Sequence, residues 1–164
     1  MGNADELVAA EPVVEALFDE HWVTAWRAAY SVTGRSDLAD DAAQDAFVGA
    51  SRSLATFDRS RPFGPWIAKV ALNRARDLLR AERRRNLASL DETTEAPARA
   101  DVTGLLAAVE ALPQEQREVV VLHHVLGFKL SEVAEIVGAP EGTVTSRLGR
   151  GVARVRKNME AEHA

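Results

Sequence analysis

Residues 128–157 read FKLSEVAEIVGAPEGTVTSRLGRGVARVRK and decide the fold. Ser131 can cap a short helix by accepting a hydrogen bond from a backbone amide that the first turn leaves without a partner. Gly138 follows the apolar pattern and can adopt the left-handed conformation that ends a helix. Pro140, whose φ is fixed, suits the first turn of a second helix. The stretch therefore predicts a helix-turn-helix, and the buried side of its first helix is expected to contain Val133, Ala134 and Val137.

The second helix of this motif has an apolar side and a basic side. Two rows recur at helical spacing, the first apolar and the second polar: Val144, Leu148, Val152 and Val155, and Thr143, Arg147, Arg150 and Arg154. Residues 141–157 contain five basic residues and one acidic residue, a net charge of +4. Such a helix suits the major groove of DNA. The alternative is an amphipathic helix with a solvated charged side, and the glycine turn favours the DNA-binding interpretation.

Composition predicts an all-α protein with two small helical domains. The chain has 164 residues, 46% of them apolar, and no cysteine, which excludes disulfides and thiolate metal sites. No apolar run approaches the length that spans a membrane, so we expect a soluble, unprocessed, cytoplasmic protein without membrane insertion. The neighbours His123 and His124 would point about 100° apart on a helix and cannot readily share a metal. With no catalytic signature either, we expect no enzyme and no cofactor.

The net charge of −5 hides a strong polarity along the chain. Residues 1–45 contain ten acidic and two basic residues, a net charge of −8. Residues 61–85 contain eight basic and two acidic residues, a net charge of +6. Because DNA responds to the local charge of a patch, this acidic protein can still bind nucleic acid.

Three helices are expected before the motif's domain. The first runs from Glu11 to Val32 and is closed by Gly34, and the second runs from about Ser36 to Thr56. The outer side of the second helix would expose an acidic and polar patch with an apolar edge: Asp41, Gln44, Asp45 and Val48. The alternative is that this patch is an ordinary solvated face.

Residues 57–65, FDRSRPFGP, cannot be regular structure because two prolines and a glycine lie within them. Pro65 is expected to start the third helix, whose outer side carries a polar stripe: Lys69, Asn73, Arg76, Arg80 and Arg83. A basic helix beside a loop with Phe57 and Phe63 suits the binding of single-stranded DNA, because cations follow the backbone while bases stack on aromatic rings. The alternative is a surface helix whose arginines only aid solubility. Asn73 favours a binding role because an amide can hydrogen-bond to base edges.

Residues 86–103 have lost helical periodicity and are predicted to form a flexible linker between the two domains. Asp101 or Thr103 can cap the next helix, Pro113 restarts the chain, and a further helix is expected to end at Gly127. The predicted domains are therefore residues 11–85 and 104–160.

From about Leu17 to Val155 the chain resembles the extracytoplasmic-function sigma factors of bacterial RNA polymerase. The segment DDAAQDAF, residues 40–47, looks like that family's polymerase-docking helix. Residues 61–80, RPFGPWIAKVALNRARDLLR, are similar to the segment that melts and reads the minus-ten promoter element. Residues 112–150 look like the reader of the minus-thirty-five element, and this match is the most specific.

The resemblance implies a role for each candidate residue. Docking on core RNA polymerase would use Asp41, Gln44, Asp45 and Val48, with Phe47 in the same helix. Minus-ten DNA would contact Phe57, Arg59, Arg61, Phe63, Lys69, Asn73, Arg76 and Arg80. Minus-thirty-five DNA would contact Thr143, Thr145, Ser146, Arg147, Arg150 and Arg154. The implied partners are core RNA polymerase, promoter DNA and an anti-sigma factor.

Several residues depart from the family pattern: Ala50, Gly64, Pro65, Thr145, Gly149 and Gly151. Glycine inside a helix costs about 0.5 to 1 kcal/mol relative to alanine, so Gly149 and Gly151 predict a reader that frays towards its C-terminal half or has an unusual sequence preference. Two alternatives stay open. The chain could be a sigma mimic that sequesters an anti-sigma factor without binding DNA, or an ordinary two-domain regulator whose N-terminal domain senses a ligand or dimerises.

Overall fold

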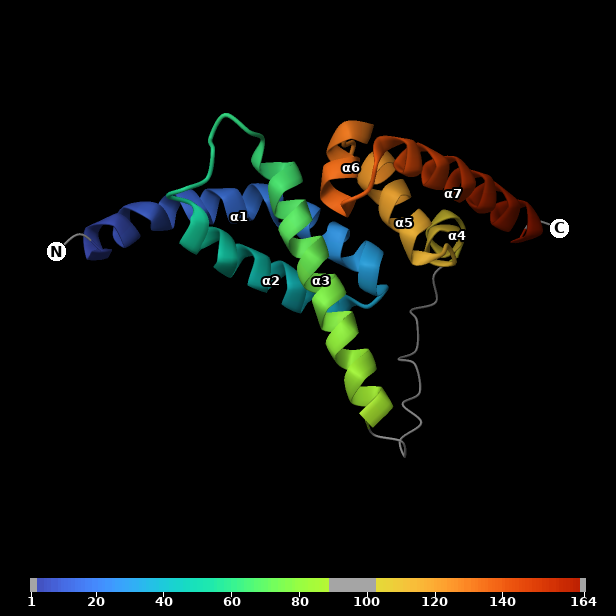
Figure 1. Ribbon diagram of the computed structural model, residues 1–164, viewed down its shortest axis with the longest axis horizontal. Helices are drawn as coiled ribbons and strands as arrows, with labels where there is room; N and C mark the ends of the chain where they lie inside the picture. The colour runs from blue at the N-terminus through green and yellow to red at the C-terminus, as the bar shows by residue number, and fades with distance from the viewer. Residues whose placement is uncertain (1–2, 89–102, 163–164) are drawn as a thin grey trace.

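The computed structural model describes residues 3–88 and 103–162, and in these ranges the chain is helical and contains no strand. Three helices form an N-terminal bundle and the remaining ones a C-terminal bundle, as Figure 1 shows. The start of α1 and the end of α7 lie at opposite ends of the long axis. The prediction of an all-α fold made of two small helical domains is confirmed.

The N-terminal bundle consists of α1 (Asn3–Thr33), α2 (Ser36–Ser53) and α3 (Phe63–Ala88). Its core is rich in alanine, which lets the three helices approach closely; the buried alanines include Ala25, Ala29, Ala42, Ala46, Ala68, Ala71 and Ala75. Gly34 has a φ of 61° and its N–H donates to Tyr30 O over 2.8 Å, so the predicted end of the first helix is confirmed.

Helix boundaries in this bundle differ from the predicted ones. The first helix begins at Asn3, not Glu11, and runs through Pro12. The second ends at Ser53, and turns continue the chain to Thr56. The third begins at Phe63, so that Pro65 lies in its first turn, where a helix does not use the missing N–H.

Arg35 joins the start of α2 to α3. Its guanidinium lies 2.7 Å from an Asp37 carboxylate oxygen and 2.6 Å from a Glu82 oxygen. The hydrogen bond from Arg35 lowers the pKa of Asp37, and the two carboxylates raise the pKa of Arg35. The Arg35 side chain therefore anchors the start of α2 to α3.

The C-terminal bundle consists of α4 (Leu105–Glu110), α5 (Gln114–Val120), a π-helical turn η1 (Val121–Val125), α6 (Leu130–Val137) and α7 (Glu141–Glu162). Its core contains Val119, Leu122, Val133, Ile136 and Val144. The predicted glycine turn is confirmed: Gly138 has a φ of 72°, and its N–H donates to Ala134 O over 3.0 Å. Pro140 directly precedes α7.

Two local predictions in this bundle are wrong. Lys129, not Ser131, is the N-cap of α6, and its backbone N–H donates to Glu132 over 2.8 Å. Gly104, not Thr103, is the N-cap of α4; it has a positive φ, and its backbone N–H donates to the Glu162 carboxylate. The other predicted cap, Asp101, lies outside the described residues. The predicted helix end at Gly127 is confirmed: Gly127 has a φ of 75° and lies just after η1, the turn in which the chain changes to π-helical geometry at Val121.

The two bundles pack against each other, α3 on α6 and α1 on α5 and η1 (Figure 1). Of the segment predicted as a linker, residues 86–88 are the end of α3, and residues 89–102 lie outside the described residues. The contact between the bundles brings the third and the sixth helix together, although they are far apart in the sequence.

Candidate nucleic-acid interface

We use the term minus-ten surface for the residues that the sequence predicts to contact minus-ten DNA: Phe57, Arg59, Arg61, Phe63, Lys69, Asn73, Arg76 and Arg80. Its aromatic residues form one cluster at the start of α3. The ring centroids of Phe57 and Phe63 lie 5.7 Å apart, and that of Trp66 lies 5.0 Å from Phe57 and 5.4 Å from Phe63. The sequence analysis missed Trp66, although its position one turn after Phe63 in the same segment could have indicated it.

A hydrogen-bonded turn shapes the loop before this cluster. The Asp58 carboxylate accepts the Ser60 hydroxyl over 2.6 Å and the Ser60 backbone N–H over 3.0 Å. These bonds, the hydroxyl's first, lower the pKa of Asp58. Arg59 is exposed, and the Arg61 guanidinium lies 2.8 Å from Glu135 of α6. The loop is therefore ordered by its own side chains and touches the other bundle.

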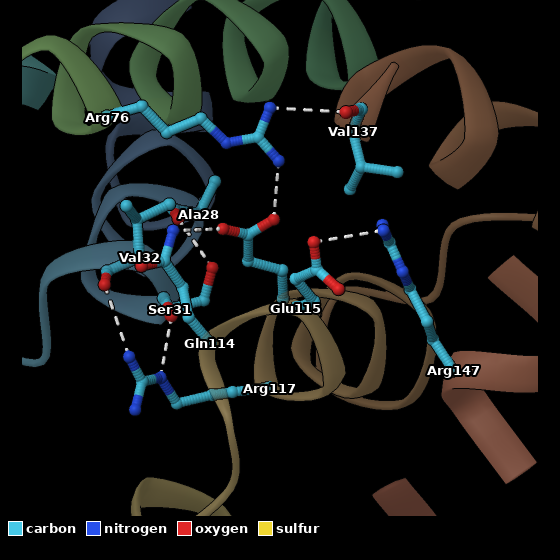
Figure 2. Close-up of polar contacts among 10 residues, drawn as sticks. Ala28, Ser31, Val32, Arg76, Gln114, Glu115, Arg117, Val137 and Arg147 are labelled. Atoms are coloured by element: carbon cyan, nitrogen blue, oxygen red, sulfur yellow. Dashed lines mark hydrogen bonds and ion pairs between the residues drawn. The ribbon is translucent and has the colours of Figure 1, made fainter. Parts of the chain in front are cut away.

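The polar stripe of α3 is exposed at Lys69, Asn73 and Arg80, as predicted from its spacing. Arg76 differs because it is only 26% exposed. It donates to Glu118 of α5 over 2.6 Å and to Val137 O of α6 over 3.1 Å, and Figure 2 shows it reaching from α3 towards Val137. The residue in the middle of the predicted DNA stripe thus contacts the C-terminal bundle.

A cleft of about 300 Å³ lies between the minus-ten surface and α6. One wall contains Phe57, Trp66 and Lys69, and the opposite wall contains Glu132 and Glu135. Aromatic and cationic groups on one wall can hold bases and phosphates. The opposite wall presents carboxylates, which have the same sign of charge as phosphate.

The outward face of α7 is rotated relative to the predicted one. Thr145, Ser146 and Arg150 are exposed, and so is Arg154. Thr143 is half-buried, and Arg147 is 19% exposed because its guanidinium lies 3.1 Å from Glu115 of α5 (Figure 2). Four of the six residues predicted to contact duplex DNA are therefore exposed, whereas Thr143 and Arg147 are partly buried.

Gly149 and Gly151 do not interrupt α7, since the helix is continuous to Glu162. Gly151 is buried, and a Cβ at this position would lie 2.7 Å from Val120 Cγ2. A Cβ at Gly149 would meet nothing within 4 Å. The predicted fraying is wrong at Gly151 for a physical reason: glycine is what allows α7 to pack closely on α5.

The predicted docking face, Asp41, Gln44, Asp45 and Val48, is exposed along α2. Val48 is 51% exposed, which makes it the apolar edge of an otherwise polar face. Asp45 is partly engaged, with a carboxylate oxygen 2.7 Å from Arg74 of α3. Phe47 is only 5% exposed, with its ring centroid 5.0 Å from that of Phe18, so it belongs to the core and not to the surface.

The histidines and acidic side chains do not gather into a metal site in the part of the chain that the structure describes. Within residues 3–88 and 103–162, no group of three or more histidine, cysteine, aspartate and glutamate side chains could hold a metal ion. His123 is instead within hydrogen-bonding distance of Phe128 O, at 2.7 Å from Nδ1. Among the helices of the same ranges, none combines the length and the apolar character needed to cross a membrane.

Comparisons with known proteins agree with this architecture. Residues 17–85 match the family model described as Sigma-70 region 2, and residues 104–155 match the one described as Sigma-70, region 4. The chain is 30% identical to the ECF RNA polymerase sigma factor SigL of Mycobacterium tuberculosis, over 98% of this chain and 97% of the relative. It is 29% identical to the RNA polymerase sigma factor CnrH of Cupriavidus metallidurans, over 98% and 96%.

Two solved structures have a similar fold. The structure of CnrH in complex with the cytosolic domain of CnrY has a TM-score of 0.68 and 28% identity, over 94% of this chain and 95% of that chain. The sigma factor RpoE in complex with the anti-sigma factor NepR from Bartonella quintana has a TM-score of 0.78 and 22% identity, over 89% and 96%.

The two bundles and the helix-turn-helix therefore define a sigma factor of the sigma-70 type, a class of DNA-binding transcription factors that direct RNA polymerase to promoters. Within that class, the chain belongs to the extracytoplasmic-function sigma factors. The resemblance stated from the sequence is confirmed.

Proposed function

We propose that this chain docks on core RNA polymerase through the exposed face of α2, reads the minus-thirty-five element with α7, and melts the minus-ten element with the minus-ten surface. The observation that carries the melting step is the aromatic cluster of Phe57, Phe63 and Trp66 directly beside exposed Lys69. Opening DNA without ATP requires trapping unstacked bases, and flipping a base costs a few kcal/mol. Stacking on aromatic rings and contacts between cations and the strand can offset that cost.

The reading of the minus-thirty-five element rests on the exposed residues of α7. Thr145, Ser146 and Arg150 lie in its first half, which follows the glycine turn as in a helix-turn-helix that inserts its second helix into the major groove. Two separate elements read by two bundles give avidity when their spacing fits.

The test is transcription in vitro with reconstituted holoenzyme on a promoter that this holoenzyme has selected from random DNA. Lys69→Ala combined with Arg80→Ala should abolish transcription and leave the binding of core polymerase nearly unchanged, because both side chains are exposed on the side of α3 that we propose contacts DNA. Arg85→Ala is the matched control, since Arg85 is an exposed arginine of the same helix that lies well off the stripe. Loss of both activities, or of neither, would contradict the assignment.

We also propose that an anti-sigma factor holds this chain. Support comes from CnrH, which was solved in complex with the cytosolic domain of CnrY and aligns with nearly the whole chain. The alternative of a sigma mimic that never binds DNA loses part of its basis, because Gly151 is a packing requirement and not a defect of the reader. Pull-down with core polymerase separates the two: a sigma factor binds it, whereas a mimic does not.

A further inference from the structure

A cleft lined by arginines lies between the two bundles, and we call it the arginine cleft. Its volume is about 390 Å³, which is within the range of small-molecule sites. Its arginines come from α3 and α7: Arg76, Arg80 and Arg83, and Arg147. Because its walls come from both bundles, the cleft is complete only in this closed arrangement, in which α3 packs on α6.

The walls of the arginine cleft carry a net positive charge. Arg76, Arg80 and Arg83 recur at i, i+4 and i+7, so they lie on one face of α3. Four arginines line the cleft together with two glutamates, Glu115 and Glu118, which gives a net charge of +2. A cleft with walls of low dielectric constant concentrates the field of such charges, so this cleft attracts anions.

The two glutamates do not fill the place of an anion. Glu118 is buried, and Arg76 and Gln114 Nε2 donate to its two oxygens over 2.6 and 2.9 Å, so this carboxylate is already satisfied. Glu115 is 68% exposed, and it lies 3.1 Å from Arg147. An exposed ion pair contributes about 0 to 1 kcal/mol, so Arg147 can exchange Glu115 for a bound anion at little cost.

The arginines keep N–H groups that a ligand can use. A guanidinium has five N–H groups, and in Arg76 Val137 O and Glu118 take two of them. Figure 2 shows Arg76 reaching in from α3 and Arg147 from α7. Arg80 and Arg83 are exposed at the edge of the cleft, where they can turn towards a ligand.

We propose that the arginine cleft binds a small anion with two or more phosphate groups. The guanidinium fork matches the oxygens of a phosphate group and binds two of them at once. An anion that reaches from the arginines of α3 to Arg147 needs charged groups at both ends, and a single phosphate does not provide them. Such a ligand links the two bundles.

A bound anion would compete with DNA, because Arg76 and Arg80 also belong to the minus-ten surface. This consequence rests on the proposed function of that surface, whereas the site itself does not. Binding is therefore measured on the free full-length chain without DNA, so that failure of the site and failure of the proposed function give different results.

The test is isothermal titration calorimetry at physiological salt with three probes: inorganic phosphate, tripolyphosphate and ATP. We expect tripolyphosphate to bind at one site per chain and at least about tenfold more tightly than phosphate, because it replaces one charge-assisted contact by several. If ATP binds as tightly as tripolyphosphate, the ligand class is nucleoside polyphosphates. If tripolyphosphate alone binds, it is polyphosphates without a nucleoside. Either result supports the proposal.

Two variants locate the site. Arg147→Ala should weaken the binding of tripolyphosphate about tenfold, because it removes the cation of the α7 wall. Arg83→Ala should weaken it about threefold, since this cation is exposed. Replacing an exposed side chain leaves the fold intact, so Arg83→Ala serves even if Arg147→Ala does not fold. Arg85→Ala is the matched control: Arg85 is an exposed arginine of α3 outside the cleft, and its variant should bind as the unchanged chain does.

The inference is overturned by the absence of saturable binding, by an equal loss in Arg85→Ala, or by full binding in the double variant of Arg83→Ala and Arg147→Ala. A single-stranded oligonucleotide is titrated in parallel. Tight binding of the oligonucleotide, but of neither tripolyphosphate nor ATP, would show that these arginines serve DNA alone, and this would also overturn the inference.

Discussion

Gly149 and Gly151 are two positions apart in α7, and their surroundings give them opposite roles. Gly151 faces α5, where a Cβ would lie 2.7 Å from Val120 Cγ2 and 3.5 Å from Gln116 O. Val120 is buried and β-branched, so its side chain has little freedom to move aside. Gly149 is exposed, and a Cβ added to it would have no neighbouring atom within 4 Å.

We therefore expect Gly151→Ala to lower the free energy of unfolding and Gly149→Ala to raise it. Overpacking a core costs about 1 to 3 kcal/mol, which exceeds the gain of about 0.5 to 1 kcal/mol from replacing a helical glycine. At Gly149 only that gain applies. Urea unfolding of both variants beside the unchanged chain measures the difference, and a change of the same sign in both would show that the packing argument is wrong.

At the scale of single helices, α7 shows why a face can be predicted only approximately. Its apolar row, from Val144 onward, predicts a helix whose outward side lies opposite that row. The partner of Arg147 is Glu115, a residue of another helix. No local sequence pattern indicates an ion pair between two different helices, so the sequence could not show that Arg147 turns inward.

Other elements were predictable because their signals are local. The ends of the first helix and of α6 follow from Gly34 and Gly138, whose positive φ angles only glycine adopts readily. The loop before α3 was predictable from the prolines in its sequence. In contrast, the burial of Glu118 depends on Arg76, 42 positions away. Local turns and helix spacing were thus within reach of the sequence, whereas contacts between distant helices were not.

The exposed side of α7 leads to a prediction about duplex DNA. Arg150 is exposed beside Ser146, with its guanidinium 3.2 Å from Ser146 Oγ, so it is placed to contact a phosphate. Arg150→Ala should then reduce the slope of log affinity against log salt concentration by about 1 for duplex minus-thirty-five DNA. Arg156→Ala, which removes an exposed arginine from a different side of the helix, should leave the slope unchanged. Fluorescence anisotropy at several salt concentrations measures both, and equal slopes in all three proteins would exclude a phosphate contact by Arg150.

At the scale of the whole molecule, the charge polarity of the sequence gains a structural meaning. The segment with a net charge of +6 contains most of α3, and the closed arrangement presents acidic residues of the C-terminal bundle to it. The chain thereby neutralises part of its own basic surface. The overall net charge of −5 gave no sign of this, because only the packing of α3 on α6 brings the two regions together.

Arg117 also joins the bundles, and it does so through backbone carbonyls. Its guanidinium donates to Ser31 O over 2.6 Å and to Val32 O over 3.1 Å at the end of α1 (Figure 2). It also donates to Glu110 O over 3.0 Å in its own bundle. The last carbonyls of a helix lack partners within the helix and carry partial negative charge, so a cation there is favourable.

Replacing Arg117 should therefore uncouple the bundles. We expect the unchanged chain to unfold in one calorimetric transition, because neither bundle can melt without losing the contact between them, and Arg117→Ala to unfold in two. Arg27→Ala, which removes an exposed arginine from α1, should keep the single transition. A single transition in Arg117→Ala would show that the carbonyl contacts do not couple the bundles, and two transitions in the unchanged chain would show that the bundles melt independently even when closed.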